Sequence, residues 1–346
     1  MERPVRGAGA GQALMPSTGL RNFVIALTRR SALGVLTIWL VATITFALVA
    51  NAPGDPMLAL MGDDGDAEVR ARAAQSFGAD RPALVRYAAW MVHLASFDLG
   101  TSMSFRAPVA EVIFGRLPAT LALMLPALLL SSGLAILFAL TPAAARSWRR
   151  GAKLALGAAL SAMPVFVLAQ GLIYVFALKL AWLPMQGLSD PRAPSAGFAA
   201  ALDAARHLAL PIVALTLHQL IVSWLFLRAR IGEESRRLYL RTALAKGLSL
   251  GQATRRHLWP NARLGFLHFV AARTGSLLAG AVLVENVFGI AGMGRLIVTA
   301  SLARDIPLVT GIFLCVAALV VAANAVADAW SVFLDPRLEG GQPDAA

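Results

Sequence analysis

Charged residues and cysteine are both scarce in this chain. Asp, Glu, Lys and Arg make up 14% of its 346 residues, whereas they make up about a quarter of an ordinary soluble domain. The single cysteine, Cys315, cannot form an intrachain disulfide or build a cysteine cluster for zinc or an iron–sulfur centre. Apolar residues make up 58% of the chain. This composition excludes three classes of protein: a typical soluble enzyme, a disordered tail and a small domain stabilised by disulfides.

The apolar residues are gathered into six runs, each long enough to cross a bilayer. A hydrocarbon core about 30 Å thick needs about 20 mostly apolar residues in a helix. The runs are Ser31–Ala52, Leu117–Ala145, Leu154–Leu180, Leu208–Leu227, Leu264–Phe288 and Pro307–Leu334. Because a spanning segment must satisfy its own backbone hydrogen bonds, runs of this length predict helices. We therefore expect an all-α polytopic membrane protein with six transmembrane helices.

The first run, Ser31–Ala52, has two interpretations. Its end, Ala50-Asn51-Ala52, looks like a signal-peptide cleavage site made of small residues. The apolar core of a signal peptide is about 7–15 residues long, however, and this run is longer. We therefore expect 31–52 to be retained as the first transmembrane helix.

The Lys and Arg residues are distributed unevenly between the two sides of the predicted membrane. Most of the 31 fall in the first tail, in the loop after the second run and in the segment Arg228–Arg263. Because cytoplasmic loops are enriched in Lys and Arg, this bias places both termini in the cytoplasm. A net charge of +12 can also indicate nucleic-acid binding, but here the charge is divided among loops between spans. We expect no nucleic-acid partner.

The runs and their orientation divide the chain into segments. Residues 1–30 form a cytoplasmic tail that we expect to be partly disordered, and 335–346 form a second cytoplasmic tail. Residues 53–116 form a long outer segment. Within it we predict two short helices on the outer surface, Glu68–Phe77 and Pro82–Ser96.

The cytoplasmic segment 228–263 is too long for a tight turn. Glu233–Lys246 contains no Gly or Pro and predicts a helix, which Gly247 ends. Ser249 is a good cap for a second helix, Leu250–Leu258, which Pro260 is expected to end. Two short helices joined by a Gly turn outside the membrane can enter a groove on a partner. An ordinary positive-inside loop is the alternative.

No arrangement of residues in the sequence predicts catalysis. A phosphate-binding P-loop needs Gly-Lys followed by Ser or Thr, but the three lysines follow Ala152, Leu178 and Ala245. If ATP drives this protein, another chain binds it. The five histidines include no pair at helical spacing with a Glu, so we expect no metal site. We expect the chain not to be an enzyme.

Polar residues inside the runs are costly, and they mark either function or hydrogen bonds between helices. Both interpretations stay open for the residues that can line a polar path, which are Gln170, His218 and Gln219. For Asn324 and Asp328 we favour bonds between helices or a position close to the membrane interface. Arg273 also lies within the fifth run. Glu285, at the outer end of that run, is expected to be structural.

One stretch of the cytoplasmic segment resembles the coupling loop of ABC-importer permeases. It reads Arg-Thr-Ala-Leu-Ala-Lys-Gly-Leu-Ser over residues 241–249, and Pro260-Asn261-Ala262 follows. The general pattern of that family is Glu-Ala-Ala, three residues, Gly, nine residues, then Ile-x-Leu-Pro. The spacing from Gly247 to Pro260 fits this pattern. The Arg-Thr-Ala start resembles the peptide/nickel branch of the family.

Other blocks resemble the same branch in order and spacing, over residues 21–338. They are Pro53-Gly54-Asp55-Pro56, Asp98-Leu99-Gly100-Thr101-Ser102, Arg116-Leu117-Pro118-Ala119-Thr120, Leu183-Pro184-Met185-Gln186-Gly187, Val284-Glu285-Asn286-Val287-Phe288 with Gly292-Met293-Gly294, Arg304-Asp305-Ile306-Pro307, and Leu334-Asp335-Pro336-Arg337. The long outer segment resembles the B-type permease of dipeptide and oligopeptide systems. The departures from the pattern are Ala291 for Pro, Ile306 for Tyr, and His257 and Trp259 for apolar residues.

The resemblance implies a fold, a function and a set of partners. The fold is the type I ABC-importer transmembrane domain over 117–334, in a multi-pass protein of the bacterial inner membrane. The function is that of a permease subunit for peptides. The partners are a homologous C-type permease, two ATPases that hold ATP and magnesium, an external substrate-binding protein and the lipid bilayer, with no cofactor in this chain. The implied ATPase-coupling residues are Arg241, Thr242, Ala243, Ala245, Lys246, Gly247, Ser249, Pro260 and Asn261.

Two alternatives stay open beside the peptide permease. The first is a permease of the same family with another cargo, such as a nickel chelate, glutathione or a short oligosaccharide. The second is a stand-alone channel or secondary transporter. Secondary transporters often carry internal repeats, and we find no repeat in this sequence.

Overall fold

The computed structural model describes residues 17–50, 82–141, 157, 162–190 and 197–334, and its secondary-structure elements in these ranges are all helices. The predicted runs fall on seven of these helices. They are α1 (Ser17–Ala50), α5 (Val109–Leu140), α7 (Val165–Leu172) with its π-helical continuation η1 (Ile173–Lys179), α8 (Gly197–Glu234), α11 (Trp259–Ala272) followed by α12 (Thr274–Val287), and α14 (Ile306–Leu334).

Three of these helices, α5, α8 and α14, are long and apolar enough to cross a membrane. The stretches Leu250–Ala272 and Thr274–Val287, bent by 44° at the break between them, pass the same test together and give a fourth span if the pair counts as one. The apolar stretches Ala32–Leu48 of α1 and Val165–Lys179 are shorter within the described part of the chain. The all-helical membrane architecture is therefore confirmed, whereas the count of six spans stays a prediction.

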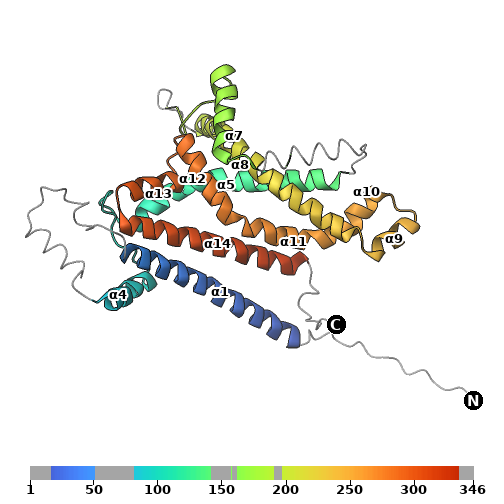
Figure 1. Cartoon of the computed structure of the whole chain (residues 1–346), viewed down its shortest axis with the longest axis horizontal. Coiled ribbons are helices and arrows are strands. Elements are labelled where there is room, and N and C mark those ends of the chain that lie inside the picture. Colours follow the sequence, from blue (N-terminus) through green and yellow to red (C-terminus); the bar gives the residue numbers. More distant parts are fainter. Residues whose placement is uncertain (1–16, 51–81, 142–156, 158–161, 191–196, 335–346) are drawn as a thin grey trace, which may run out of the picture.

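The two ends of the described chain lie towards the same end of the molecule (Figure 1). The start of α1 and the end of α14 lie there, near α9 (Leu238–Ala245) and α10 (Leu250–Ala253). The helices α4 (Ala83–Ala95) and α13 (Met293–Leu302) lie at the opposite end. This arrangement agrees with termini and a coupling segment that share one side of a membrane.

Close packing of α5 against α8 forms the main core. Ala127 of α5 and Ala214 of α8 are both fully buried, and small side chains let helix backbones approach closely. Leu215 of α8 also contacts α12, since a Cβ atom on Gly280 would lie 3.3 Å from its methyl group. Pro126 and Pro211 lie inside these helices, which membrane helices tolerate when neighbouring groups satisfy the freed carbonyls.

Several predicted boundaries differ from the structure. Helix α1 begins at Ser17, so that residues 17–30 are helical, and α5 begins at Val109, inside the predicted outer segment. The short helix predicted over Pro82–Ser96 is confirmed as α4, whose Tyr87 and Trp90 rings pack against Phe46 of α1. The helix predicted over Glu68–Phe77 lies outside the described residues, as does Asn51.

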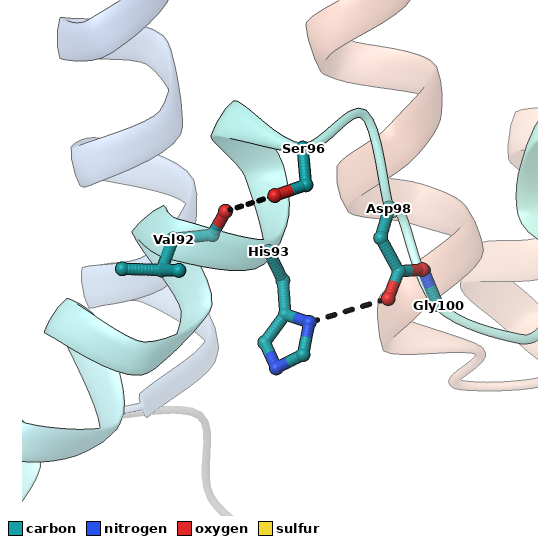
Figure 2. A network of polar contacts seen from close by, with 5 residues as sticks. All are labelled: Val92, His93, Ser96, Asp98 and Gly100. Carbon is teal, nitrogen blue, oxygen red and sulfur yellow. Dashed lines mark hydrogen bonds and ion pairs between the residues drawn. The ribbon is translucent and has the colours of Figure 1, made fainter.

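A tight turn follows α4, inside the Asp-Leu-Gly-Thr-Ser block (Figure 2). The Ser96 hydroxyl donates to the Val92 carbonyl, at 3.1 Å. Figure 2 shows the Asp98 carboxylate facing both the His93 ring, at 3.2 Å, and the backbone N–H of Gly100, which donates to it at 2.9 Å. Gly100 adopts a φ of 78°, which glycine reaches without strain. The turn directs the chain back towards α5.

Asp305 fastens this outer turn to the start of α14. Its buried carboxylate accepts from the Ser102 hydroxyl at 2.6 Å, from Ser104 N–H at 2.9 Å and from Leu308 N–H at 3.2 Å. Burial opposes ionisation, but these donors outweigh it and hold the pKa of Asp305 below its ordinary value. Two blocks that are about two hundred residues apart in the sequence are thus joined by one carboxylate.

Replacing Asp305 with alanine is expected to destabilise the protein by about 2 kcal/mol at pH 7, because several donors lose their acceptor. A carboxyl whose folded pKa is lowered contributes stability above its unfolded pKa and loses it as the pH falls through the folded value. Acidification below about pH 4 should therefore destabilise the wild type more than Asp305→Ala. Thermal unfolding in detergent between pH 7 and pH 3 measures this. Parallel pH profiles for the two proteins would contradict the assignment.

Candidate functional site

The helix α9 ends in the turn that the sequence predicts. Gly247 adopts a φ of 86°, and its N–H donates to the Leu244 carbonyl at 2.9 Å. The next N–H, that of Leu248, donates to the Ala243 carbonyl at 3.3 Å. These two bonds make a Schellman motif, which satisfies carbonyls at the helix end and favours Gly at the left-handed position. The predicted stop at Gly247 is confirmed.

The second helix of the segment also begins as predicted. Gln252 N–H donates to the Ser249 hydroxyl at 3.3 Å, and the Gln252 side chain accepts from Ser249 N–H at 3.0 Å. This reciprocal capping box satisfies two N–H groups that the start of α10 would otherwise leave unpaired.

The predicted stop at Pro260 is wrong, because the helix runs through it. A π-helical turn, η2 (Thr254–Leu258), follows α10, and Pro260 lies in the first turn of α11. A π turn widens the backbone. Proline lacks an N–H and clashes with the carbonyl four residues earlier in a regular α-helix, and the π turn directly before Pro260 is where this helix departs from the regular geometry. Pro260 does disturb regular helix geometry, as the prediction assumed, but the π turn before it lets the helix continue.

The first helix of the segment also differs from its prediction over Glu233–Lys246. Helix α8 continues to Glu234, and the chain then turns before α9 begins at Leu238. The Ser235 hydroxyl donates to the Gly232 carbonyl at 2.7 Å and competes for the backbone acceptors of the last turn. The turn lets Leu240 face the rest of the segment.

The two helices form a compact knob, defined here as residues 238–258. Its interior is a small apolar cluster of four buried residues, which are Leu240, Ala243, Ala253 and Leu258. The exposed side carries the residues Leu238, Arg241, Thr242, Ala245 and Lys246. Leu238 is 75% exposed and Leu250 58% exposed. The knob thus presents apolar and cationic side chains together, which suits a partner groove with acidic and apolar walls.

Tyr239 connects the knob to the helices on both sides. Its hydroxyl donates to the Glu234 carboxylate at 2.8 Å and accepts from the Asn261 amide at 3.3 Å. Asn261 also donates to the His257 carbonyl at 2.9 Å. Burial, and then the hydrogen bond to Glu234, raise the pKa of Tyr239 above its ordinary value. A tyrosine hydroxyl is protonated at neutral pH with or without this shift, so it can donate to Glu234.

The structure brings together only part of the predicted polar path. Gln219 is fully buried in α8 and accepts from the Arg273 guanidinium at 3.2 Å. His218 is partly buried beside it, whereas Gln170 is exposed on α7 and forms no side-chain hydrogen bond within the described chain. The sequence placed Arg273 in the fifth run but did not join it to Gln219. Arg273 contacts Gln219 at the break between α11 and α12, and no pattern in the sequence predicted that break.

Glu285 is structural, as the sequence analysis expects. Its fully buried carboxylate accepts from the Thr120 hydroxyl at 2.7 Å and from Arg295 N–H at 3.0 Å. The Thr120 oxygen in turn accepts from Met293 N–H at 2.8 Å. These bonds hold the start of α13 against α5 and α12. Gly292 and Gly294 fit there because a Cβ atom on either would collide with the Glu285 carboxylate.

The two polar residues of α14 divide between the expected roles. Asp328 lies 3.5 Å from the His268 ring of α11, which is the interhelical contact that we favoured. Asn324 instead donates to the Val320 carbonyl of its own helix, at 2.9 Å. An amide that lacks a polar neighbour across the interface bonds to the preceding helical turn instead.

Two family models together cover most of the chain. The model described as "Binding-protein-dependent transport system inner membrane component" matches residues 131–340. The chain belongs to this family. The model for the N-terminal part of such membrane components matches residues 23–124. The permease resemblance drawn from the coupling segment is therefore confirmed.

Relatives of this permease cover nearly the same length. The di/tripeptide transport system permease protein DppB of Pseudomonas aeruginosa is 34% identical over 328 residues, which cover 90% of this chain and 98% of the relative. The dipeptide transport system permease protein DppB of Alkalihalophilus pseudofirmus is 31% identical, with 86% and 93% covered. The oligopeptide transport system permease protein AppB of Bacillus subtilis is 29% identical, with 90% and 98% covered.

Replacing Tyr239 with phenylalanine is expected to loosen the knob of this permease without unfolding it. The change removes one hydroxyl that bonds to Glu234 and Asn261, and a hydrogen bond to a charged group contributes about 1.5–3 kcal/mol. We expect faster hydrogen–deuterium exchange in α9 than in the wild type. Arg241→Gln, which removes an exposed side chain of the same helix, is the control. Equal exchange in wild type and Tyr239→Phe would exclude this role for the hydroxyl.

Proposed function

We propose that this permease is a subunit of a bacterial inner-membrane ABC importer, and that its knob contacts a partner ATPase. The observation that carries the proposal is the geometry of residues 238–258. A buried cluster, a Schellman turn and a capping box fix the knob from within, so that its apolar and cationic face is held ready for a partner. A rigid surface loses little conformational entropy when it binds.

The coupling mechanism follows from this rigidity. ATP and magnesium bind on the ATPase subunits, and closure of the ATPases displaces the knob. The proposed contact residues are the exposed ones, with Arg241 and Lys246 giving polar contacts to the partner. Ala243 belongs to the buried cluster inside the knob, Pro260 follows the knob in the first turn of α11, and Asn261 bonds to Tyr239. Coupling means that ATP binding on the ATPase changes the free energy of the transport path. A flexible loop would transmit that change poorly.

Peptides are the proposed cargo. The relatives that match this chain over most of their length are peptide, dipeptide and oligopeptide permeases by name. In this proposal a C-type permease completes the path and an external binding protein delivers the peptide. The alternative cargos within the family are nickel chelates, glutathione and short oligosaccharides.

Partner identification tests the proposal directly. The chain is tagged and extracted in mild detergent, and co-purifying proteins are identified by mass spectrometry. We expect one second permease and P-loop ATPases in stoichiometric amounts. A homo-oligomer without any ATPase would refute the importer function and favour a channel or secondary transporter. Titration of peptides and of the alternative cargos onto the cognate binding protein then decides the cargo.

A further inference from the structure

Arg273 lies at the break between α11 and α12, inside the predicted fifth run. The predicted run that contains it extends from Leu264 to Phe288. At 1.5 Å per residue, Arg273 is about 14 Å from one end of the run and about 22 Å from the other. Arg273 therefore lies well inside the run, away from both of its ends. A charge at such a depth is costly and requires a counter-charge or a polar cavity.

The only side-chain acceptor that the described residues offer to Arg273 is the Gln219 oxygen, at 3.2 Å. No carboxylate among the described residues lies within ion-pairing distance of the guanidinium. The positive charge is therefore hydrogen-bonded but not neutralised within this part of the chain.

Further polar groups beside Gln219 and Arg273 in the chain are buried without a partner among the described residues, and none of them carries a negative charge. Gln219 uses its oxygen for Arg273, and its amide nitrogen, although buried, has no partner within the described residues. Thr216 and Ser223 lie three and four residues from Gln219, on the same face of α8, and their buried hydroxyls also lack partners there. The Thr274 hydroxyl and the Arg273 Nε are also buried and have no partner among the described residues.

A guanidinium without a counter-charge, beside N–H and O–H groups that have no partner among the described residues, fits a carboxylate. Water can satisfy a hydroxyl, but it does not neutralise a charge, and a cation would be repelled. A carboxylate has two oxygens that only accept, and its planar shape matches the guanidinium in a two-bond contact. Gln219, almost fully buried, can supply an additional N–H to the same oxygens.

We propose that Arg273 and Gln219 form a carboxylate-binding site in the transport path, which receives a carboxylate of the cargo. For a peptide, the carboxylate that every cargo shares is the one at its C-terminus. The inference rests on the proposed importer function and adds to it the chemical group that the permease recognises. His218 lies beside Gln219 in the wall of the site, and its buried Nδ1 likewise has no partner among the described residues.

Uptake by the reconstituted importer tests this site. The assay compares a tripeptide with its C-terminal amide, each delivered by saturated binding protein into proteoliposomes that contain the full complex. We expect Arg273→Gln to lower uptake of the free tripeptide about tenfold to a hundredfold, which matches the loss of one charged hydrogen-bonded contact. Arg273→Lys should restore part of the rate. Uptake of the amide should be the same in wild type and Arg273→Gln.

Arg228→Gln is the matched control, because Arg228 lies on α8 but packs over the Trp224 ring, 5.4 Å from its centroid. It should leave the ratio of the two uptake rates unchanged. Equal loss of both cargos in Arg273→Gln would show a structural role and overturn the site, and so would no loss of either. If the wild type assembles with no ATPase, the proposed function fails and this inference fails with it.

A second measurement does not depend on the binding protein. Phenylglyoxal modifies arginines that water reaches, and mass spectrometry locates the modified residues. We expect Arg273 in the purified complex to react, and millimolar free tripeptide, but not its amide, to protect it. Arg228 should not be protected by either. An Arg273 that does not react, or that the tripeptide does not protect, would overturn the site.

Discussion

Replacing Gly247 with aspartate is expected to abolish transport and the stimulation of the partner ATPase, while the chain still inserts into the membrane. Gly247 is the left-handed residue of the Schellman turn, and a Cβ atom there would meet nothing within 4 Å. Aspartate tolerates this backbone conformation better than most residues, at a strain of about 1–2 kcal/mol. The turn should therefore survive. The new carboxylate would stand beside Lys246 and alter the charge of the face proposed to enter the ATPase.

Asparagine at position 247 separates charge from backbone strain. It has nearly the same shape as aspartate and the same tolerance for a positive φ, but it is neutral. We expect Gly247→Asn to keep most of the transport activity. Uptake and ATPase rates in proteoliposomes, with membrane insertion checked by fractionation, measure both variants. Wild-type transport in Gly247→Asp would show that the knob does not couple to an ATPase.

Replacing Glu285 with alanine should have the largest effect on stability. It removes the acceptor for the Thr120 hydroxyl and for Arg295 N–H, and each buried donor left unpaired costs about 1–3 kcal/mol. It also leaves a void beside Gly292 and Gly294, whose missing side chains make room for the carboxylate. We expect a loss of about 3–5 kcal/mol and a large drop in the amount of folded protein. Thermal unfolding of the purified complex measures it.

The neighbouring residue provides the control. Asn286 is exposed and donates only to the Val282 carbonyl of its own helix, so Asn286→Ala should change stability by less than about 1 kcal/mol. Glu285→Gln should restore only part of the lost stability. Glutamine has one acceptor oxygen, whereas the Thr120 hydroxyl and the Arg295 N–H each donate to a separate oxygen of Glu285. If Glu285→Ala unfolds at the wild-type temperature, the carboxylate does not hold α13 in place.

Much of the helical architecture could be predicted because length and hydropathy determine it. The described parts of the six runs fall mainly on helices, and Gly247 and Ser249 mark helix ends by local chemistry that needs no tertiary contact. Pro260 misled the prediction because its effect depends on whether the helix can widen before it. The boundary at Ser235 was missed because the turn there allows Leu240 to pack into the buried cluster of the knob. The sequence alone does not predict that contact.

The candidate site likewise has one part that could be predicted from the sequence and one part that could not. The knob is local in sequence, so its residues could be named in advance. The pairing of Gln219 with Arg273 joins positions 54 residues apart and depends on a bend of 44° that no pattern marks. The blocks that carry the family resemblance turn out to bond to one another, since Ser102 meets Asp305 and Thr120 meets Glu285. Their spacing was visible in the sequence, but their pairing was not.

The helical stretch from Leu250 to Ala272 has a mechanical consequence. It runs without a loop from the capped start of α10 to the residue before Arg273. At 1.5 Å per residue this rod is about 34 Å long, so tilting it by about 10° moves its far end by about 6 Å relative to the near end. A carboxylate-guanidinium contact breaks over a much shorter distance. If Arg273 binds a carboxylate as proposed, a small rotation imposed at the α10 end would therefore be enough to break that contact.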